Sequence, residues 1–213
     1  MKEIILYHGS KGGIKGNIKP ASRSNCDFGR GFYMGENRNQ AASLVLNQDD
    51  AFLYTLRVTL SDDLKILHLR DEDWLYAVLS NRGRIPEFNS LKLASKWKAK
   101  LLQYDLVTGI IADDRMNEAM RAFSRYALSD AGLYYCMQQA DYGSQYAAKT
   151  PKMCENIAIV DQTQVNSQTF PELGQYMDER RTESKNIVQT ATARFRGNGT
   201  YLDQLIRQED EDA

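Results

Sequence analysis

The sequence DFGRGFYMG at residues 27–35 is the stretch around which the rest of the chain is organised. Three of its nine residues are glycine, which is needed where a backbone turns sharply or where another group lies directly against it. Phe32 and Tyr33 are consecutive, so on an extended strand one ring can enter the core while the other contacts a ligand. Next, Asn37 can cap a helix, with Gln40 three residues later as in a capping box. An ordinary strand, turn and helix would explain this pattern equally well.

A short apolar strand is predicted upstream, in the sequence EIILYHGS at residues 3–10. It ends in His8-Gly9-Ser10. A histidine at a strand end suits a nucleotide pocket when glycine follows, because a flat group can then reach the backbone amide. A single histidine is more often structural, so His8 becomes a candidate site residue only together with the downstream motifs.

These motifs follow one another in order: His8-Gly9, Gly13-Ile14, the segment from Phe28 to Tyr33, and a helix that opens on Gln40-Ala41-Ala42. This order resembles the NAD-binding half of ADP-ribosyltransferases of the diphtheria-toxin and poly(ADP-ribose) polymerase type, over roughly residues 4–160. It is more similar still to a bacterial family of that clan often encoded in toxin–antitoxin pairs. The resemblance implies an α+β fold, in which a split pair of small antiparallel β-sheets encloses an NAD cleft with helices around it.

Cleavage of the nicotinamide–ribose bond of NAD develops positive charge on the ribose, much as glycoside hydrolysis does. An enzyme needs an aromatic wall against the nicotinamide, groups that grip its amide, and an anchor for the ribose hydroxyls. By the resemblance, Tyr33 is the wall, the Gly9 backbone binds the nicotinamide amide, and His8 holds a ribose hydroxyl. Arg30 could approach the diphosphate or the acceptor. The resemblance also assigns to the cofactor site the neighbouring motif residues Ser10, Gly31 and Gln40, and makes Lys19 and Arg23 candidates for phosphate contact.

The third position of the family motif is usually a glutamate that binds the ribose 2′-hydroxyl, and here it is Gln145. A neutral amide can still hydrogen-bond the hydroxyl but brings no charge, which leaves open how the cation is stabilised. Asp113 and Asp114 follow a predicted buried strand at residues 106–111. Two such carboxylates are more often a helix cap with a salt bridge. By the resemblance they could position the acceptor or take its proton.

Composition narrows the class of protein. The chain has 213 residues, 42% of them hydrophobic and 26% charged, which allows one domain with appendages. The formal net charge of −1 gives no support for strong nonspecific binding to nucleic acid. No apolar run approaches the roughly 20 residues that span a bilayer, and no leader pattern is present. The three scattered cysteines fit free thiols rather than a metal site, so we expect a cytoplasmic protein with no membrane association.

The chain divides by composition near residue 160. Strands are predicted at 52–60, 64–69, 106–111, 144–150 and 155–160, with helices near 71–79, 91–103, 117–126 and 129–140. We therefore assign residues 1–160 to an ADP-ribosyltransferase-like catalytic domain. Residues 161–213 form a polar, mostly helical C-terminal extension, which needs a partner or the rest of the chain to hold it.

The resemblance favours an NAD-dependent ADP-ribosyltransferase, with NAD as co-substrate and an intracellular protein or nucleic acid as acceptor. It implies the toxin of a toxin–antitoxin or phage-defence system, restrained by a cognate antitoxin. A noncatalytic module that binds NAD or ADP-ribose is the alternative that Gln145 motivates. An RNA 2′-phosphotransferase is disfavoured, because its cleft would need several arginines and the motifs supply only Arg30.

Overall fold

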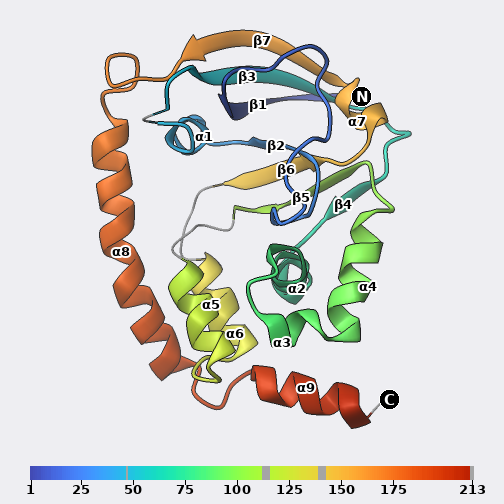
Figure 1. Cartoon of the computed structure of the whole chain (residues 1–213), viewed down its shortest axis with the longest axis vertical. Helices are drawn as coiled ribbons and strands as arrows, with labels where there is room; N and C mark the ends of the chain where they lie inside the picture. The colour runs from blue at the N-terminus through green and yellow to red at the C-terminus, as the bar shows by residue number, and fades with distance from the viewer. Residues whose placement is uncertain (47, 112–115, 139–142, 212–213) are drawn as a thin grey trace.

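The computed structural model describes residues 1–46, 48–111, 116–138 and 143–211, with the side chains of all of these except 116–117, 138 and 180–186. The predicted α+β class is confirmed: a seven-stranded mixed sheet is packed against helices (Figure 1). The strand order is β4-β5-β6-β2-β1-β3-β7, and only the β4–β5 pair is parallel. The strands are β1 (Lys2–Lys11), β2 (Phe32–Gly35), β3 (Ala51–Leu60), β4 (Ile66–His68), β5 (Leu106–Ile110), β6 (Ser144–Ala148) and β7 (Ile157–Gln164).

Strands β1 and β3 pair along their whole length, from Lys2 opposite Leu60 to Lys11 opposite Ala51. Strand β3 lies between β1 and β7, so alternate apolar residues such as Leu56 and Val58 are fully buried. Each strand expected from period-2 alternation or from an apolar run is present. Strand β7 continues past residue 160 to Gln164.

The sheet is continuous, whereas we expected two separate small sheets. Its two parts are joined at the centre by β1 and β2, whose only registered pair is Tyr7 with Gly35. Strand β1 follows β3 beyond this point, while the four-residue β2 follows β6. The sheet is therefore one structure that parts locally after Tyr7.

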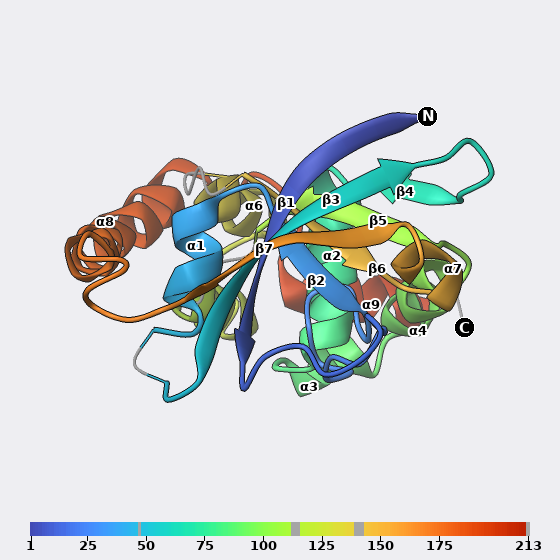
Figure 2. The same ribbon diagram turned by 90° about the horizontal axis from the view of Figure 1, so that it is seen from above.

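The helices are distributed unevenly around this sheet. Helices α2 to α6 gather beside the β4–β6 end, α1 lies beside β1 and β2, and α8 runs along one side of the molecule (Figures 1 and 2). Asn37 caps α1 through its side-chain oxygen, which accepts from the Gln40 amide at 3.0 Å, as the capping pattern predicted. The helices are α1 (Arg38–Ser43), α2 (Asp71–Arg82), α3 (Pro86–Asn89), α4 (Lys92–Leu101), α5 (Met116–Ser124), α6 (Asp130–Gln138), α7 (Pro151–Cys154), α8 (Leu173–Arg194) and α9 (Leu202–Glu211).

The two faces of the sheet carry different apolar clusters. On one face, Trp74, Phe88 and Phe123 belong to a core built by α2, α3 and α5, and Tyr33 packs against it. On the opposite face, Phe32 packs with Leu56 and other strand residues. The expected division of the two aromatic residues between opposite faces is therefore confirmed, with Phe32 buried and Tyr33 half-buried.

The C-terminal extension packs on the rest of the chain. Ala191 of α8 and Leu202 of α9 are fully buried in the largest core cluster. The Glu209 carboxylate accepts hydrogen bonds from the backbone amides of Lys92 and Leu93, each at 2.7 Å, at the start of α4. The body thus supplies the contacts that a polar helix needs. Across the described ranges, no helix combines the length and apolar character required to cross a membrane.

Candidate functional site

Gly35 lies where the two parts of the sheet meet. It is opposite Tyr7 of β1 on one side and opposite Gln145 of β6 on the other. The candidate residues His8, Tyr33 and Gln145 consequently lie on three neighbouring strands, β1, β2 and β6. The sheet topology brings these residues together although they are distant in sequence.

His8 bonds to β2 through its side chain. Its Nδ1 lies 2.6 Å from the carbonyl oxygen of Tyr33, and because a carbonyl only accepts, Nδ1 carries the proton. The His8 ring packs 4.3 Å from that of Phe32. Burial lowers the pKa of His8 below its ordinary value, against a smaller raising effect of the bond to Tyr33. The ring is therefore neutral at pH 7, and its Nε2 is a hydrogen-bond acceptor.

The hydroxyl of Tyr33 is fixed by two hydrogen bonds. It donates to the Gly29 carbonyl at 2.6 Å and accepts from the Phe28 amide at 2.9 Å. Burial raises the pKa of Tyr33, and the charge of Asp27 raises it further. The phenol therefore remains neutral at physiological pH. It holds a half-buried ring in place rather than moving a proton.

Gln145 is buried, and its amide orientation follows from its partners. Nε2 donates to a carboxylate oxygen of Asp27 at 2.7 Å and to the Ile110 carbonyl at 3.1 Å. Both partners only accept, so the nitrogen must face them. The amide oxygen takes part in neither bond. Gln145 thus has a hydrogen-bond acceptor available, which is the role a glutamate would fill at this position.

Asp27 is a site residue that the sequence reasoning missed. Its other carboxylate oxygen accepts from Arg82 Nε at 2.6 Å, and both side chains are only 10% exposed. Asp27 opens the 27–35 stretch, but its partners Gln145 and Arg82 are 118 and 55 residues away in sequence. No local pattern predicts such pairing. Position 145 itself carries no negative charge, but its amide is hydrogen-bonded directly to the carboxylate of Asp27.

Lys149 was missed as well. Its ammonium donates to the Phe28 carbonyl, on the turn whose amide binds the Tyr33 hydroxyl. Burial lowers the pKa of Lys149 to about 8, with a smaller opposing effect from Cys26. The turn that positions Tyr33 is therefore held from β2 by the phenol and from the end of β6 by Lys149.

The glycines of the motifs have clear packing reasons. A Cβ at Gly9 would lie 2.2 Å from the Ala41 carbonyl oxygen, so α1 packs directly against this backbone. Gly31 donates to the Ser22 hydroxyl at 3.0 Å and would place a Cβ 3.1 Å from the Ala148 carbonyl oxygen. A side chain at position 9 would therefore collide with backbone, whereas at position 31 it would make a tight contact that requires a small shift of the backbone.

The remaining predicted cofactor residues differ in how deeply they are buried. Gln40 is buried, with its side-chain oxygen 3.6 Å from where a Cβ of Gly35 would lie. Ser10 is half-buried opposite Phe52, and Arg30 is exposed. The loop residues Lys19 and Arg23 are also exposed, and Asp113 and Asp114 lie outside the described residues.

The side chains do not all share one face of the sheet. Tyr33 and Gln145 face the same side, since Gly35, opposite Gln145, is two residues after Tyr33. His8 faces the other side, where its ring meets Phe32, and it contacts Tyr33 only through the backbone carbonyl. The site is therefore arranged around the edge where β1 and β2 part. In the described part of the chain, no three His, Cys, Asp or Glu side chains cluster as metal ligands.

Comparison with known proteins places the chain in a family. No curated protein and no solved structure matched it. A family model described as "Protein of unknown function (DUF3990)" matches residues 4–159, from β1 into β7. The match includes His8, Asp27, Tyr33 and Gln145, and it excludes α8 and α9. The chain therefore belongs to the DUF3990 family of proteins of unknown function.

Proposed function

We propose that this protein is an NAD-dependent ADP-ribosyltransferase, with its site where β1 and β2 part. The observation that carries the proposal is the arrangement of His8, Tyr33 and Gln145 on three adjacent strands, each held by a specific hydrogen bond. Rigid placement of several polar groups and one aromatic ring is what selective cleavage of a glycosidic bond requires. The motif resemblance supports the same assignment.

In the proposed mechanism the nicotinamide ring lies against Tyr33, and Gln145, on the same face of the sheet, holds a ribose hydroxyl. His8 lies on the other face, so it reaches a ribose hydroxyl only across the point where β1 and β2 part. The Gln145 amide oxygen and the His8 Nε2 are both acceptors in the protonation states that their partners impose. As nicotinamide leaves, its bond to the ribose breaks, the electron pair stays with nicotinamide, and the ribose becomes cationic.

Asp27 supplies part of the charge that glutamine lacks, because its carboxylate also pairs with Arg82. Its carboxylate is bonded to the Gln145 amide, so it polarises that amide toward a more negative oxygen. Electrostatic stabilisation is usually the largest catalytic effect when charge develops in a buried site. Asp27 acts through Gln145 and is a positioning residue. We further propose that Asp113 or Asp114 positions the acceptor or takes its proton.

The resemblance also supports a proposal for the acceptor and the partner of this protein. By resemblance to toxin–antitoxin-associated proteins, we propose that the protein is the toxin of a toxin–antitoxin or phage-defence system and that a cognate antitoxin restrains it. Its acceptor is a protein or nucleic acid in the cytoplasm. The family match ends at residue 159, so α8 and α9 lie outside the matched part of the chain. We propose that the exposed surface of this extension contacts the antitoxin.

A noncatalytic module that binds NAD or ADP-ribose is the second candidate. The observation in its favour is that the Tyr33 hydroxyl and the Gln145 amide nitrogen are both used in bonds within the protein. An RNA 2′-phosphotransferase is disfavoured, since it needs several arginines in the cleft. Here Arg30 is exposed, and Arg82 pairs with Asp27.

The test is incubation with adenylate-labelled NAD, followed by mass spectrometry of candidate protein, RNA and DNA targets and of free ADP-ribose. Tyr33→Ala should abolish turnover while the protein stays folded. Asp27→Asn should lower kcat by about tenfold or more with a smaller change in KM. Glu36→Gln is the matched control, because Glu36 also bonds to β6 but is exposed, and it should retain parental kcat. NAD binding without turnover in the parent would favour the noncatalytic module.

A further inference from the structure

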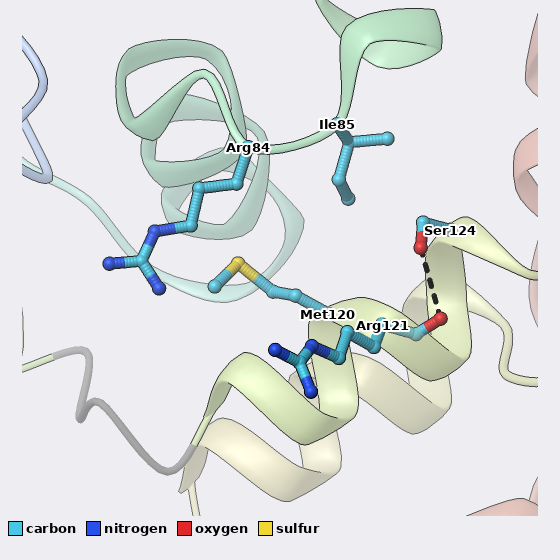
Figure 3. Close-up of a pocket in the computed structure, with 5 residues that line it drawn as sticks. All are labelled: Arg84, Ile85, Met120, Arg121 and Ser124. Atoms are coloured by element: carbon cyan, nitrogen blue, oxygen red, sulfur yellow. Dashed lines mark hydrogen bonds between the residues drawn. The ribbon is translucent and has the colours of Figure 1, made fainter.

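A hollow of about 240 Å³ lies on the helical side of the molecule, between α5 and the segment that follows α2. Figure 3 shows the side chains that line it, which are Arg84, Ile85, Met120, Arg121 and Ser124. The arginines come from different elements, so the hollow exists only in the folded chain. None of these residues belongs to the site described above.

Arg84 and Arg121 give the hollow its charge. Helix α2 ends at Arg82, the left-handed φ of +65° at its C-cap Gly83 turns the chain, and Arg84 follows in an exposed position. Figure 3 shows the two guanidinium groups on either side of the end of the Met120 side chain. The ion pairs among the described residues involve neither arginine. Both arginines are also exposed, so their guanidinium groups are accessible to a ligand from solvent.

The floor of the hollow is apolar. Ile85 and Met120 are each only 3% exposed, and both belong to the main core cluster. An apolar floor excludes water on one side and strengthens the interaction of the guanidinium groups with an anion. The Ser124 hydroxyl donates to the Arg121 carbonyl at 3.0 Å, so its hydrogen is already used. Among the described side chains that line the hollow, the two arginines supply the donors that remain for a ligand.

The charge and donor geometry favour a phosphate over a carboxylate. A guanidinium fork forms two parallel bonds to a carboxylate or a phosphate, so one arginine already satisfies a carboxylate. Two arginines match a phosphomonoester, which carries about −1.5 to −2 charge at pH 7 and three terminal oxygens. The hollow is also larger than one water, whose share of liquid volume is about 30 Å³. It therefore leaves room for the group attached to the phosphate.

We propose that this hollow binds a phosphomonoester, held by Arg84 and Arg121 over the Ile85–Met120 floor. The ligand is a small sugar phosphate or the terminal phosphate of an oligonucleotide, two sources with the same recognised chemistry. This inference does not depend on NAD cleavage.

Calorimetric titration with ribose 5-phosphate, at pH 7.5 and low salt, tests the proposal. The parent should bind it and should not bind ribose. Arg84→Gln and Arg121→Gln should each weaken binding by about tenfold, and the double variant should abolish it. Arg125→Gln removes an exposed arginine just after α5 that does not line the hollow, and it should bind like the parent. Tyr33→Ala should also bind like the parent, which separates this ligand from any at the proposed NAD site.

Two further measurements complete the test. Binding should weaken below about pH 6, where a phosphomonoester gains its second proton. Fluorescence anisotropy with one oligonucleotide, bearing either a 5′-phosphate or a 5′-hydroxyl, identifies the source of the phosphate. Higher affinity for the 5′-phosphorylated form, lost in the double variant, indicates the end of a nucleic acid. Equal affinity for the two forms indicates a small molecule. Failure of the parent to bind ribose 5-phosphate, or parental affinity in the folded double variant, would overturn the proposal.

Discussion

The amide nitrogen of Gln145 lies 2.7 Å from a carboxylate oxygen of Asp27, which in turn pairs with Arg82 at 2.6 Å. This chain of bonds joins β6, the loop before β2, and the end of α2. It also explains why a glutamine is accommodated at position 145. A carboxylate there would face the carboxylate of Asp27, whereas an amide donates to it.

Gln145→Glu should therefore make stability depend on pH. Two adjacent carboxylates cannot both ionise at low cost, so the pKa of the new carboxyl should be raised in the folded state above the unfolded value of about 4.3. The folded variant then binds an extra proton, and its stability relative to the parent should fall as pH rises from about 4 through the raised pKa. In urea unfolding, the loss of unfolding free energy of the variant relative to the parent should be roughly 1–3 kcal/mol larger at pH 8 than at pH 5. Gln162→Glu on exposed β7 is the control, and an equal penalty at both pH values would contradict the predicted contact.

Tyr33→Phe should separate the ring from the hydroxyl. The change leaves the Phe28 amide without its acceptor and the Gly29 carbonyl without its donor, at a cost of about 1–3 kcal/mol in unfolding free energy. It keeps the aromatic face, so NAD cleavage should persist where Tyr33→Ala abolishes it. Tyr126→Phe, at a ring that is 48% exposed, should change stability by less than about 0.5 kcal/mol. A cost for Tyr33→Phe equal to that of the control would show that the turn does not depend on the phenol.

His8 should make the protein less stable in mild acid. Burial lowers the pKa of His8 in the folded state, so the unfolded chain binds this proton more readily. The stability contributed by neutral His8 is complete above the unfolded pKa of about 6.5 and is lost as pH falls through the folded pKa. Unfolding free energies measured from pH 7.5 to 5 should decline more steeply for the parent than for His8→Gln. Parallel slopes would show that His8 does not carry this dependence, and His68→Gln provides the comparison at the chain's other histidine.

Leu202→Ala should show that the C-terminal extension belongs to the fold. Leu202 is fully buried against the main core, and removing a buried leucine side chain costs about 2–5 kcal/mol. Leu102→Ala removes the same atoms at a position that is 76% exposed, so it should cost less than about 1 kcal/mol. Chemical denaturation measures both. Similar small values would indicate that α9 is not held by the body in solution.

Local patterns in the sequence were sufficient to predict the strands and the longer helices, but not the short helices α3 and α7. Alternation and apolar runs predicted the strands, the Asn37–Gln40 spacing predicted the cap of α1, and consecutive aromatic residues predicted the division of Phe32 and Tyr33 between faces. These features depend on neighbours within a few residues, and the sequence records such neighbours directly.

Only the tertiary structure decided which distant residues meet. One continuous sheet forms because Gly35 lies between Tyr7 and Gln145, where two sheets had been expected. The Asp27–Gln145 bond spans 118 residues, and the Arg84–Arg121 hollow depends on how α5 packs beside the end of α2. Such contacts arise from the packing of the whole core, in which each element can bury its apolar side in several ways until its neighbours are in place. For this reason the sequence indicated the site through His8, Tyr33 and Gln145, while the carboxylate behind Gln145 became visible only in the folded chain.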